Sequence, residues 1–349
     1  FFLIPFVGLL LVWNLTKAFK SGGRDSGIVK GVGGAFLLAS SWMIIGSFTF
    51  LLLWPAMWTD PVGALSRIFY KATHDAQVGH EFPIFFNGAT IPNGRLGDDS
   101  FYFYPLTYLW RTTPWVLVGL LLALLGVLWL HLPSRKRQTM SALVAFGFLF
   151  TFMVSLSTKK FDRYLLPVYP VLDLVAASGW VWAARWIRDL IATRGHWMRL
   201  SKWRLLPLSL VGMAQMATAF STFPYYLSYY NPLMGGAAKA PTVMMIGWGE
   251  GLDQAARYLN AKPDAGDLRV FSWMNPACFS YFFTGKSKDI PLQDEFVLDP
   301  RIVDEFFGAD YLVVYIQQQQ MRLPVQLLDY LALQTPEHSI WIDGLEYVR

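Results

Sequence analysis

The sequence Leu-Leu-Ala-Leu-Leu-Gly-Val-Leu-Trp-Leu occupies residues 121–130 and decides the fold class. It lies in a run without Asp, Glu, Lys or Arg that extends from Thr112 to Ser134. A helix needs about 20 mostly apolar residues to cross the hydrocarbon core of a bilayer. This run is long enough, so the sequence predicts a helix that spans a membrane.

Five further runs carry almost no charge, and Asp173 is the one acidic residue within them. These runs are residues 1–16, 31–59, 138–158, 164–184 and 205–238. The first is too short for a complete span. Residues 1–224 are therefore predicted to form a polytopic α-helical membrane domain with five full spans and one partial span.

The composition of the 349 residues agrees with this prediction. Hydrophobic residues make up 54% of the chain and charged residues 15%, whereas soluble domains carry about 25% charged residues. These values exclude a disordered tail, a disulfide scaffold and an ordinary cytosolic enzyme. Cys278 is the single cysteine, which excludes an internal disulfide and a Cys-x-x-Cys metal site.

The charge of the chain is divided unevenly. Residues 1–224 hold 20 basic and 9 acidic residues, a net charge of +11, and residues 225–349 hold 9 and 15, a net charge of −6. This division predicts a basic membrane domain followed by an acidic soluble domain. The chain begins Phe-Phe-Leu-Ile, without Met or a basic leader region, so we expect it to start inside a hydrophobic segment of a longer protein.

The basic residues between the spans predict the orientation, because cytoplasmic loops are rich in Lys and Arg. Thirteen of the twenty lie in three segments that fall on one side if the spans alternate. These segments are residues 14–30, 135–137 and 185–204. The loop 59–113, the turn 159–163 and the C-terminal domain are then extracytoplasmic, and the protein is predicted to be a multi-pass protein of the cell membrane.

Residues 225–349 show alternating helical and strand patterns, which predicts a small α/β domain. The predicted helices are 251–260, 300–307 and 323–333. The predicted strands are 268–272 and 311–316, with a final hairpin from 339–342 and 345–348. The glycine-rich sequence Gly247–Gly251 matches no phosphate-binding fingerprint and is predicted to be a tight turn before the first helix.

The extracytoplasmic loop 59–113 contains two further patterns. Thr59-Asp60-Pro61 predicts a helix start, and the apolar residues that follow at helical spacing predict an amphipathic helix on the outer leaflet or a helix packed on the outer domain. The aromatic stretch 101–110 predicts either a membrane-interface belt or a platform for a sugar or lipid.

The turn Thr158–Tyr164 contains the most informative charges. Lys159, Lys160 and Arg163 lie on the side that should hold few cations. A lipid phosphate is the anion expected at this depth, since Lys supplies a point charge and Arg a bidentate fork. Lys159, Lys160, Arg163 and Tyr164 are therefore predicted to bind a donor phosphate, and attraction to ordinary anionic headgroups is the alternative.

A second candidate site is the loop sequence Gly79-His80-Glu81, followed by Phe85-Phe86-Asn87-Gly88. Adjacent His and Glu side chains can transfer protons or contribute to a metal site. We predict that His80, Glu81 and Asn87 line a cavity. The spacing of the nearby acidic residues matches no metal motif, so no metal ligand is assigned, and a requirement for a divalent metal stays open.

Three stretches together resemble glycosyltransferase family 39, which is related to the protein O-mannosyltransferases and has the GT-C fold. The first is Gly79-His80 with Phe85-Phe86-Asn87-Gly88 and the segment 101–114. The second is Lys159-Lys160-Phe161-Asp162-Arg163-Tyr164-Leu165-Leu166-Pro167. The third is Tyr229-Tyr230-Asn231-Pro232-Leu233 with Gly247-Trp248-Gly249-Glu250-Gly251. The match covers roughly residues 79–260.

The resemblance implies transfer of a sugar from a polyprenyl phosphate to an acceptor hydroxyl on the extracytoplasmic face. It also implies an acidic general base in a first outer loop, which this chain lacks, so the chain by itself is expected to be inactive. The predicted partners are the lipid-linked sugar, membrane lipid and an acceptor that is a protein, a lipid or a glycan, and nucleic acid is not expected. Two alternatives stay open, a transporter or flippase of lipid-linked sugars and a membrane-anchored recognition module without catalysis.

Overall fold

The computed structural model describes residues 2–20, 25–77, 83–91, 101–129, 134–192, 206–291 and 300–349, and the fold is mostly helical. The helices of the first half are α1 (Leu3–Lys20), α2 (Asp25–Leu53), α3 (Ala56–Thr59), α4 (Pro61–Gln77), α5 (Phe103–Arg111), α6 (Pro114–Trp129) and α7 (Ser134–Ser155). The remaining helices are α8 (Val168–Ala192), α9 (Leu206–Ser221), α10 (Gly236–Lys239), α11 (Leu252–Asn260), α12 (Ser280–Phe282), α14 (Pro300–Phe307), α15 (Ile316–Met321) and α16 (Val325–Leu331). The strands are β1 (Ile84–Phe86), β2 (Ala89–Ile91), β3 (Arg269–Ser272), β4 (Lys286–Asp289), β5 (Tyr311–Val313), β6 (Ile340–Ile342) and β7 (Leu345–Val348).

The chain divides into two compact units. The first unit holds Phe1–Gly79 and Leu130–Val175, and the second holds His80–Trp129 and Ala176–Arg349. Residues 225–349 thus lie entirely in the second unit, which also contains several of the predicted spans. The predicted boundary at residue 224 separates a membrane domain from a domain outside the membrane. It is a different division from that into compact units, and it stays a prediction.

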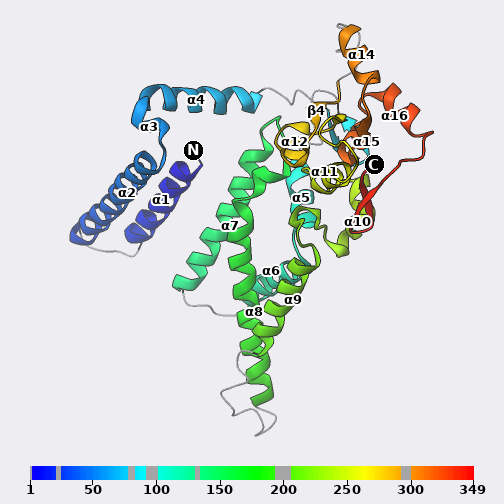
Figure 1. Cartoon of the computed structure of the whole chain (residues 1–349). Helices are drawn as coiled ribbons and strands as arrows, with labels where there is room; N and C mark the ends of the chain where they lie inside the picture. Colours follow the sequence, from blue (N-terminus) through cyan, green and yellow to red (C-terminus); the bar gives the residue numbers. More distant parts are fainter. Residues whose placement is uncertain are drawn as a thin grey trace. The chain divides into compact units, whose positions relative to one another are not determined.

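In the first unit, α1 and α2 lie side by side (Figure 1) and leave most of their apolar side chains exposed. The aromatic ring of Phe2, next to the start of α1, packs edge-on against Phe146 and Phe150 of α7, with ring centroids 5.3 and 5.1 Å apart. Val32–Leu53 has a mean hydropathy of 2.0 and no buried residue. A long helix with apolar residues on all sides is typical of contact with lipid.

Helix α4 begins as the sequence predicts. The backbone N–H of Gly63 donates to Oδ1 of Asp60 at 2.8 Å, and Pro61 occupies the first helical position, so the predicted cap is confirmed. The apolar residues Val62 and Phe69 are exposed. Both predictions for this face, contact with the outer leaflet and packing on the outer domain, stay open.

Each predicted span coincides with a helix. However, only some of these helices are long enough and apolar enough to cross a membrane. Among the described residues, α2 and α7 meet both conditions through Val32–Leu53 and Lys136–Ser155. Two strongly bent pairs, α5 with α6 and α9 with the segment Tyr226–Met234, raise the number to four if each pair is one span. The finer prediction of five full spans and one partial span stays a prediction.

Small residues bring two helices of the second unit into close contact. A Cβ atom added to Gly179 of α8 would lie 2.1 Å from the backbone oxygen of Gly119 in α6. The indole N–H of Trp180 donates to the backbone oxygen of Trp115 at 2.8 Å. Glycines at such a crossing let two backbones approach closely, which is the usual packing device of helices in membranes.

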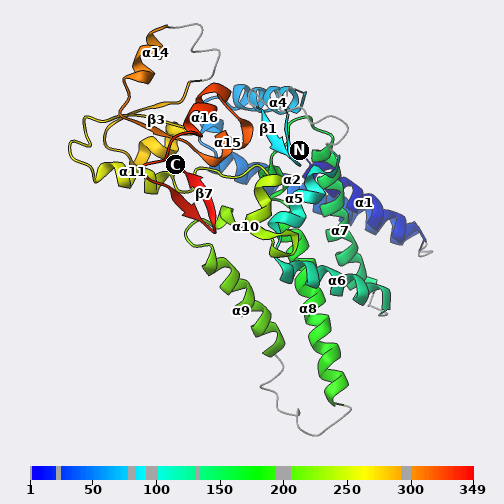
Figure 2. The same cartoon turned by 90° about the vertical axis from the view of Figure 1, so that its right-hand side faces the viewer.

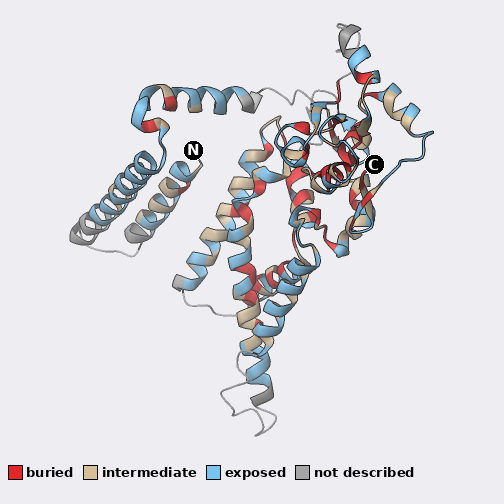
Figure 3. Ribbon diagram, in the orientation of Figure 1, coloured by how far each residue is buried: buried red, intermediate tan, exposed pale blue. Residues whose placement is uncertain are grey.

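The C-terminal part of the second unit is an α/β arrangement, as predicted. Its three-stranded parallel sheet has the order β4-β3-β5, and Phe271, Ile290 and Phe306 form a core cluster against it. The buried side chains gather here around α11 and α15, whereas α2 is exposed (Figure 3). Figure 2 shows α11, α15 and the β6–β7 hairpin in this part of the unit.

Two sequence predictions for this region were wrong in detail, and one segment had no prediction. The strand predicted at 311–316 ends at Val313, because Val314 exchanges two backbone hydrogen bonds with Arg349. The helix predicted at 323–333 is shorter, since Pro324 precedes its first residue. The polar run Gln317–Gln320 belongs to helix α15, which buries Gln317 and Gln318.

Candidate functional site

The basic turn, residues 158–164, connects the end of α7 to the beginning of α8. Its second half is a 3-10 helix, Asp162–Leu165. Leu165 and Val168 are almost completely buried and anchor the turn within the protein. Pro170 lies in the first turn of α8, where a backbone N–H has no partner within the helix to lose. The sequence thus fixes the point at which the chain reverses direction.

Lys160 points into the protein and holds the end of α7. Its side chain is buried, and its ammonium donates to the backbone oxygens of Ser155, at 2.5 Å, and Val154, at 3.3 Å. These carbonyls belong to the last turn of the helix, whose negative dipole end favours a cation. Burial lowers the pKa of Lys160 to about 8, so the side chain is still mostly charged at pH 7.

The other two cations of the turn lie nearer the surface. Arg163 is exposed, and its guanidinium lies over the ring of Phe161, 4.6 Å from the centroid, and 5.7 Å from the centroid of Tyr164. A cation over an aromatic face at an exposed site is held by about 0.5–1 kcal/mol, so the contact restrains the guanidinium at the surface of the turn. Lys159 is half-buried, and its backbone N–H donates to the Ser157 hydroxyl. The four predicted phosphate-binding residues are therefore brought together in one turn.

The predicted cavity-lining residues have different outcomes. His80 and Glu81 lie outside the described residues. Asn87 lies in the two-residue turn of the β1–β2 hairpin, with positive φ at both Asn87 (49°) and Gly88 (81°). An Asn-Gly pair between short strands is the strongest local signal for such a hairpin, but this hairpin was not among the predicted elements. The Asn87 amide donates to the Tyr102 hydroxyl at 3.5 Å.

The aromatic stretch 101–110 is largely a packing element. Phe103, Tyr104 and Trp110 are buried on α5, and the Phe103 ring lies 4.8 Å from that of Phe86 in β1. Phe101 is exposed. Phe103 thus packs on the β1–β2 hairpin, and Trp110 packs edge-on against Tyr230, with ring centroids 6.5 Å apart; the interface-belt and platform predictions stay open for the exposed rings.

Arg111 joins two of the stretches that carry the family resemblance. Its guanidinium donates to the backbone oxygens of Leu227, at 2.5 Å, and Tyr229, at 3.4 Å, and lies 4.5 Å from the ring centroid of Tyr230. The Asn231 amide donates to the Leu109 oxygen at 2.9 Å. We call these contacts the Arg111 clamp. No role was predicted for Arg111, since a cation that binds backbone carbonyls leaves no recognisable spacing.

The glycine-rich sequence before α11 is a tight turn, as predicted, and a buried carboxylate holds it together. Oε2 of Glu250 accepts hydrogen bonds from the Trp248 N–H, at 2.5 Å, and the Tyr315 hydroxyl, at 2.9 Å. The Gly249 N–H donates to the same hydroxyl at 2.9 Å. Gly247 has a φ of 94°, and a Cβ atom there would lie 2.3 Å from the Tyr315 oxygen. Glu250 thus supports the loop and is not positioned on the surface for catalysis.

Among the described residues, no group of three or more His, Cys, Asp or Glu side chains is placed to hold a metal ion. The basic turn offers cations and a phenol but, apart from Asp162, no carboxylate. Its arrangement suits binding of an anion such as a phosphate, and not of a cation. Chemically, the turn can stabilise negative charge that develops on a bound group.

Comparisons with known proteins identify no relative for this chain. No protein-family model matches the chain, and neither a curated protein nor a solved structure is significantly similar to it.

Proposed function

We propose that the protein transfers a sugar from a polyprenyl-phosphate-linked donor to an acceptor hydroxyl at the extracytoplasmic face of a membrane. The observation that carries the proposal is the arrangement of the basic turn at the end of an apolar helix. Lys159 and Arg163 lie at the surface of this turn while Lys160 holds its base. The resemblance to glycosyltransferase family 39 supplies the substrate class.

The dimensions of α7 support a position of the turn at a membrane boundary. The apolar segment Lys136–Ser155 has 20 residues, which at about 1.5 Å per residue is about 30 Å, the thickness of the hydrocarbon core. Cations flank both ends, Lys136 at the start and the basic turn after the end. In the proposed topology Lys136 faces the cytoplasm, and the basic turn and residues 225–349 lie outside.

The proposed chemistry is a displacement at the anomeric carbon. The acceptor oxygen forms a bond to this carbon, the bond to the lipid phosphate oxygen breaks, and the hydroxyl proton goes to a base. The family resemblance implies that this base is an acidic residue of an outer loop. The phosphate gains negative charge as it leaves, so fixed cations stabilise the transition state more than the ground state.

The residues of the turn have distinct roles in this proposal. Arg163 and Lys159 contact the phosphate oxygens, and the Tyr164 hydroxyl donates a hydrogen bond beside them. Lys160 is a positioning residue, because its ammonium is engaged with the last carbonyls of α7. Its buried charge still adds to the positive potential of the turn.

One observation favours the transporter alternative, since discontinuous helices are typical of transporters. The axes of α5 and α6 differ by 114°, and those of α9 and Tyr226–Met234 by 103°. However, Phe103 of α5 packs on Phe86 of the β1–β2 hairpin, and α5 buries Tyr104 and Trp110 as well. The first bend is therefore at the edge of a globular region, which favours the transferase proposal over a broken span.

The test uses the full-length protein, reconstituted in lipid vesicles with polyprenyl-phosphate mannose as the probe. Arg163→Ala and Lys159→Ala are compared with Arg188→Ala, which removes an exposed cation paired with Asp189 on α8. We expect loss of one phosphate contact to reduce turnover about 100-fold or more, in line with removal of a single transition-state donor, and Arg188→Ala to leave it unchanged.

Unchanged turnover and donor affinity in both turn variants would refute the assignment of the turn. Movement of the labelled lipid-linked sugar across the bilayer, with the label kept on the lipid, would support the transporter alternative instead.

A further inference from the structure

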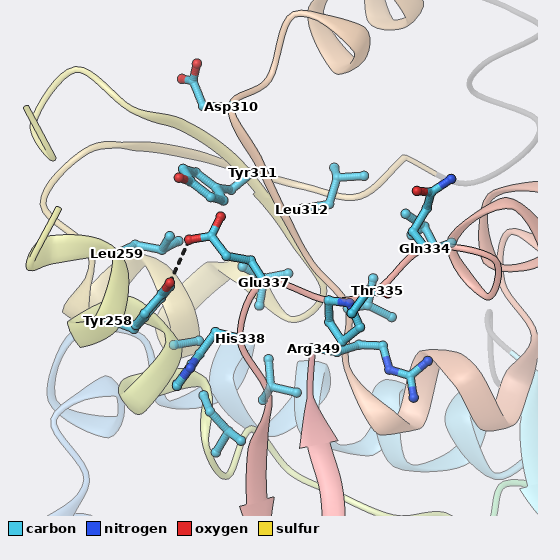
Figure 4. A pocket seen from close by; sticks show the side chains of 17 residues that line it. Tyr258, Leu259, Asp310, Tyr311, Leu312, Gln334, Thr335, Glu337, His338 and Arg349 are labelled. Carbon is cyan, nitrogen blue, oxygen red and sulfur yellow. Dashed lines mark hydrogen bonds between the residues drawn. The ribbon is translucent and has the colours of Figure 1, made fainter. Parts of the chain in front are cut away.

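The C-terminal part of the second unit contains a pocket that the proposed transfer reaction does not use. It lies between α11, strand β5, the segment 334–338 and the end of the β6–β7 hairpin, and its volume is about 340 Å³ (Figure 4). Small-molecule sites have volumes of roughly 300–1,000 Å³. We call it the C-terminal pocket. It is large enough for one small ligand.

The pocket has one apolar wall and one polar wall. The apolar wall is formed by aliphatic side chains of α11, β5 and the hairpin, among them Leu259, Leu312 and Ile340. The polar wall carries the Tyr258 hydroxyl and the carboxylate of Glu337, and Gln334 lies further along the rim (Figure 4). A ligand that fits both walls must itself have an apolar face and several hydroxyl or amide groups.

The polar wall is held in place by contacts within the protein. The Tyr258 hydroxyl donates to Oε1 of Glu337 at 2.6 Å, and Lys262 forms an ion pair with the same carboxylate oxygen. The His338 ring stacks on Tyr258 with centroids 4.1 Å apart and an angle of 7°. The Lys262 ammonium lies about 5 Å from the ring centroids of both Tyr258 and Tyr311. Such preorganisation reduces the ordering cost of binding.

The charged groups around the pocket already have partners of opposite charge or polarity. Glu337 is paired with Lys262, and this pairing, together with the Tyr258 hydrogen bond, holds the pKa of Glu337 below its usual value. Asp310 accepts a hydrogen bond from the Arg269 N–H at 2.8 Å, and Arg349 is paired with Glu346. A charged ligand would therefore compete with existing pairs, whereas a neutral polar ligand would add hydrogen bonds to them.

We propose that the C-terminal pocket binds one neutral sugar unit, with the C–H face of the ring on Leu259 and Leu312 and its hydroxyl groups on the polar wall. A purely aliphatic ligand would remove water from the Glu337 carboxylate and the Tyr258 hydroxyl without replacing its hydrogen bonds, which is costly. A pyranose satisfies both walls at once. The inference is independent of the proposed transfer reaction, because it concerns binding without turnover.

The test measures binding to the full chain in lipid nanodiscs that contain no sugar-based detergent. Methyl α-mannoside and methyl α-glucoside are the probes, followed by saturation-transfer NMR and titration. Cyclohexanol and glucuronate serve as an apolar probe and a charged probe. We expect saturable binding of at least one methyl glycoside and at least 10-fold weaker binding of both comparison probes.

Two variants localise the binding. Thr335→Trp places a large ring at an exposed position of the pocket rim, and Glu337→Gln removes the carboxylate charge while keeping its shape. Each should weaken the binding at least 10-fold. Glu305→Gln is the matched control, since it removes an exposed carboxylate that pairs with Lys288 outside the pocket, and it should leave binding unchanged.

Three results would overturn the inference. They are absence of saturable binding by both glycosides, equal binding in the two pocket variants and the unmodified chain, and binding of cyclohexanol as strong as that of the glycosides. Thermal unfolding of each variant shows whether it is folded. If the Glu337→Gln protein is misfolded, the binding measured with Thr335→Trp tests the inference, because Thr335 is at the surface.

Discussion

The basic turn and the Arg111 clamp both place a cation beside backbone carbonyl groups, but they differ in what remains at the surface. In the clamp, Arg111 binds the oxygens of Leu227 and Tyr229 and so fastens two segments of its own chain. In the turn, Lys160 binds carbonyls of α7 in the same way, whereas Arg163 is exposed. Two cations three residues apart in one motif can therefore differ in burial, and burial separates the inward-pointing Lys160 from Arg163 at the surface.

The glycine-rich loop extends this comparison to a carboxylate. Glu250 lies among glycines in a turn, and its Oε2 accepts hydrogen bonds from the Trp248 N–H and the Tyr315 hydroxyl. Tyr315 is fully buried, and burial raises its pKa well above the usual value, so its hydroxyl keeps its proton. The loop and the clamp are thus structural, and substitutions there should lower stability, whereas substitutions at the surface of the basic turn should lower function.

The largest stability effect is expected at Gly247. Gly247→Ala combines a positive φ of 94° with a Cβ atom 2.3 Å from the Tyr315 hydroxyl oxygen. We expect a loss of about 3 kcal/mol or more in the free energy of unfolding, from backbone strain and steric overlap. The matched control is Gly344→Ala, which has a φ of 80° and open space around the added atom, and should cost about 1 kcal/mol. Equal losses in thermal unfolding would show that Tyr315 does not press on the loop.

The sequence was sufficient for those parts of the fold that depend on local patterns. Apolar runs located the helices, Asp60 and Pro61 located the start of α4, and alternating patterns located β3 and the β6–β7 hairpin. The missed β1–β2 hairpin had a local signal in Asn87-Gly88. Strand β4 was missed because Lys286–Asp289 is polar and mostly exposed, so it lacks the apolar alternation on which the prediction depended.

The candidate site was only partly predictable, because burial and direction are tertiary properties. The sequence placed Lys159, Lys160 and Arg163 in one turn, but it could not show that Lys160 alone points inward. Likewise, the C-terminal pocket combines Tyr258, Tyr311 and Glu337 from three segments of the chain. No spacing in the sequence connects residues that meet only through the packing of α11 against the end of the sheet.

The next largest effect tests the clamp directly. Arg111→Met should lower the free energy of unfolding by about 2–4 kcal/mol, because it removes charge-assisted hydrogen bonds to two carbonyls. Arg257→Met is the comparison, since Arg257 forms an exposed ion pair with Asp253 that should contribute less than about 1 kcal/mol. A chain that tolerates Arg111→Met as well as Arg257→Met would contradict the structural role of the clamp.

Lys160 should give a smaller effect that depends on pH. Its pKa is about 8 in the folded state, against a usual value of 10.5, so the unfolded chain binds more protons between these values. Stability attributable to Lys160 therefore rises as the pH increases from 8 to 10.5, by up to about 3 kcal/mol. Lys160→Met should lack this rise, and Lys159→Met should keep it. Chemical unfolding at pH 7, 8, 9 and 10 measures the free energy of unfolding of the unmodified chain and both variants. The same dependence on pH in all three proteins would refute the lowered pKa of Lys160.

The smallest stability effect is expected at Arg163, and it decides whether the two regions differ in kind. The guanidinium stacks on Phe161 at an exposed position, where such a contact contributes about 0.5–1 kcal/mol. Arg163→Met should lower the free energy of unfolding by no more than this amount, while it reduces donor turnover strongly. Arg163→Lys keeps the charge but loses the planar fork, so it should restore part of the donor affinity and little of the turnover. If Arg163→Met instead destabilised the chain as much as Arg111→Met, Arg163 would be a structural cation like Arg111. The basic turn and the Arg111 clamp would then not differ in kind, and Arg163 would no longer support phosphate binding by the turn.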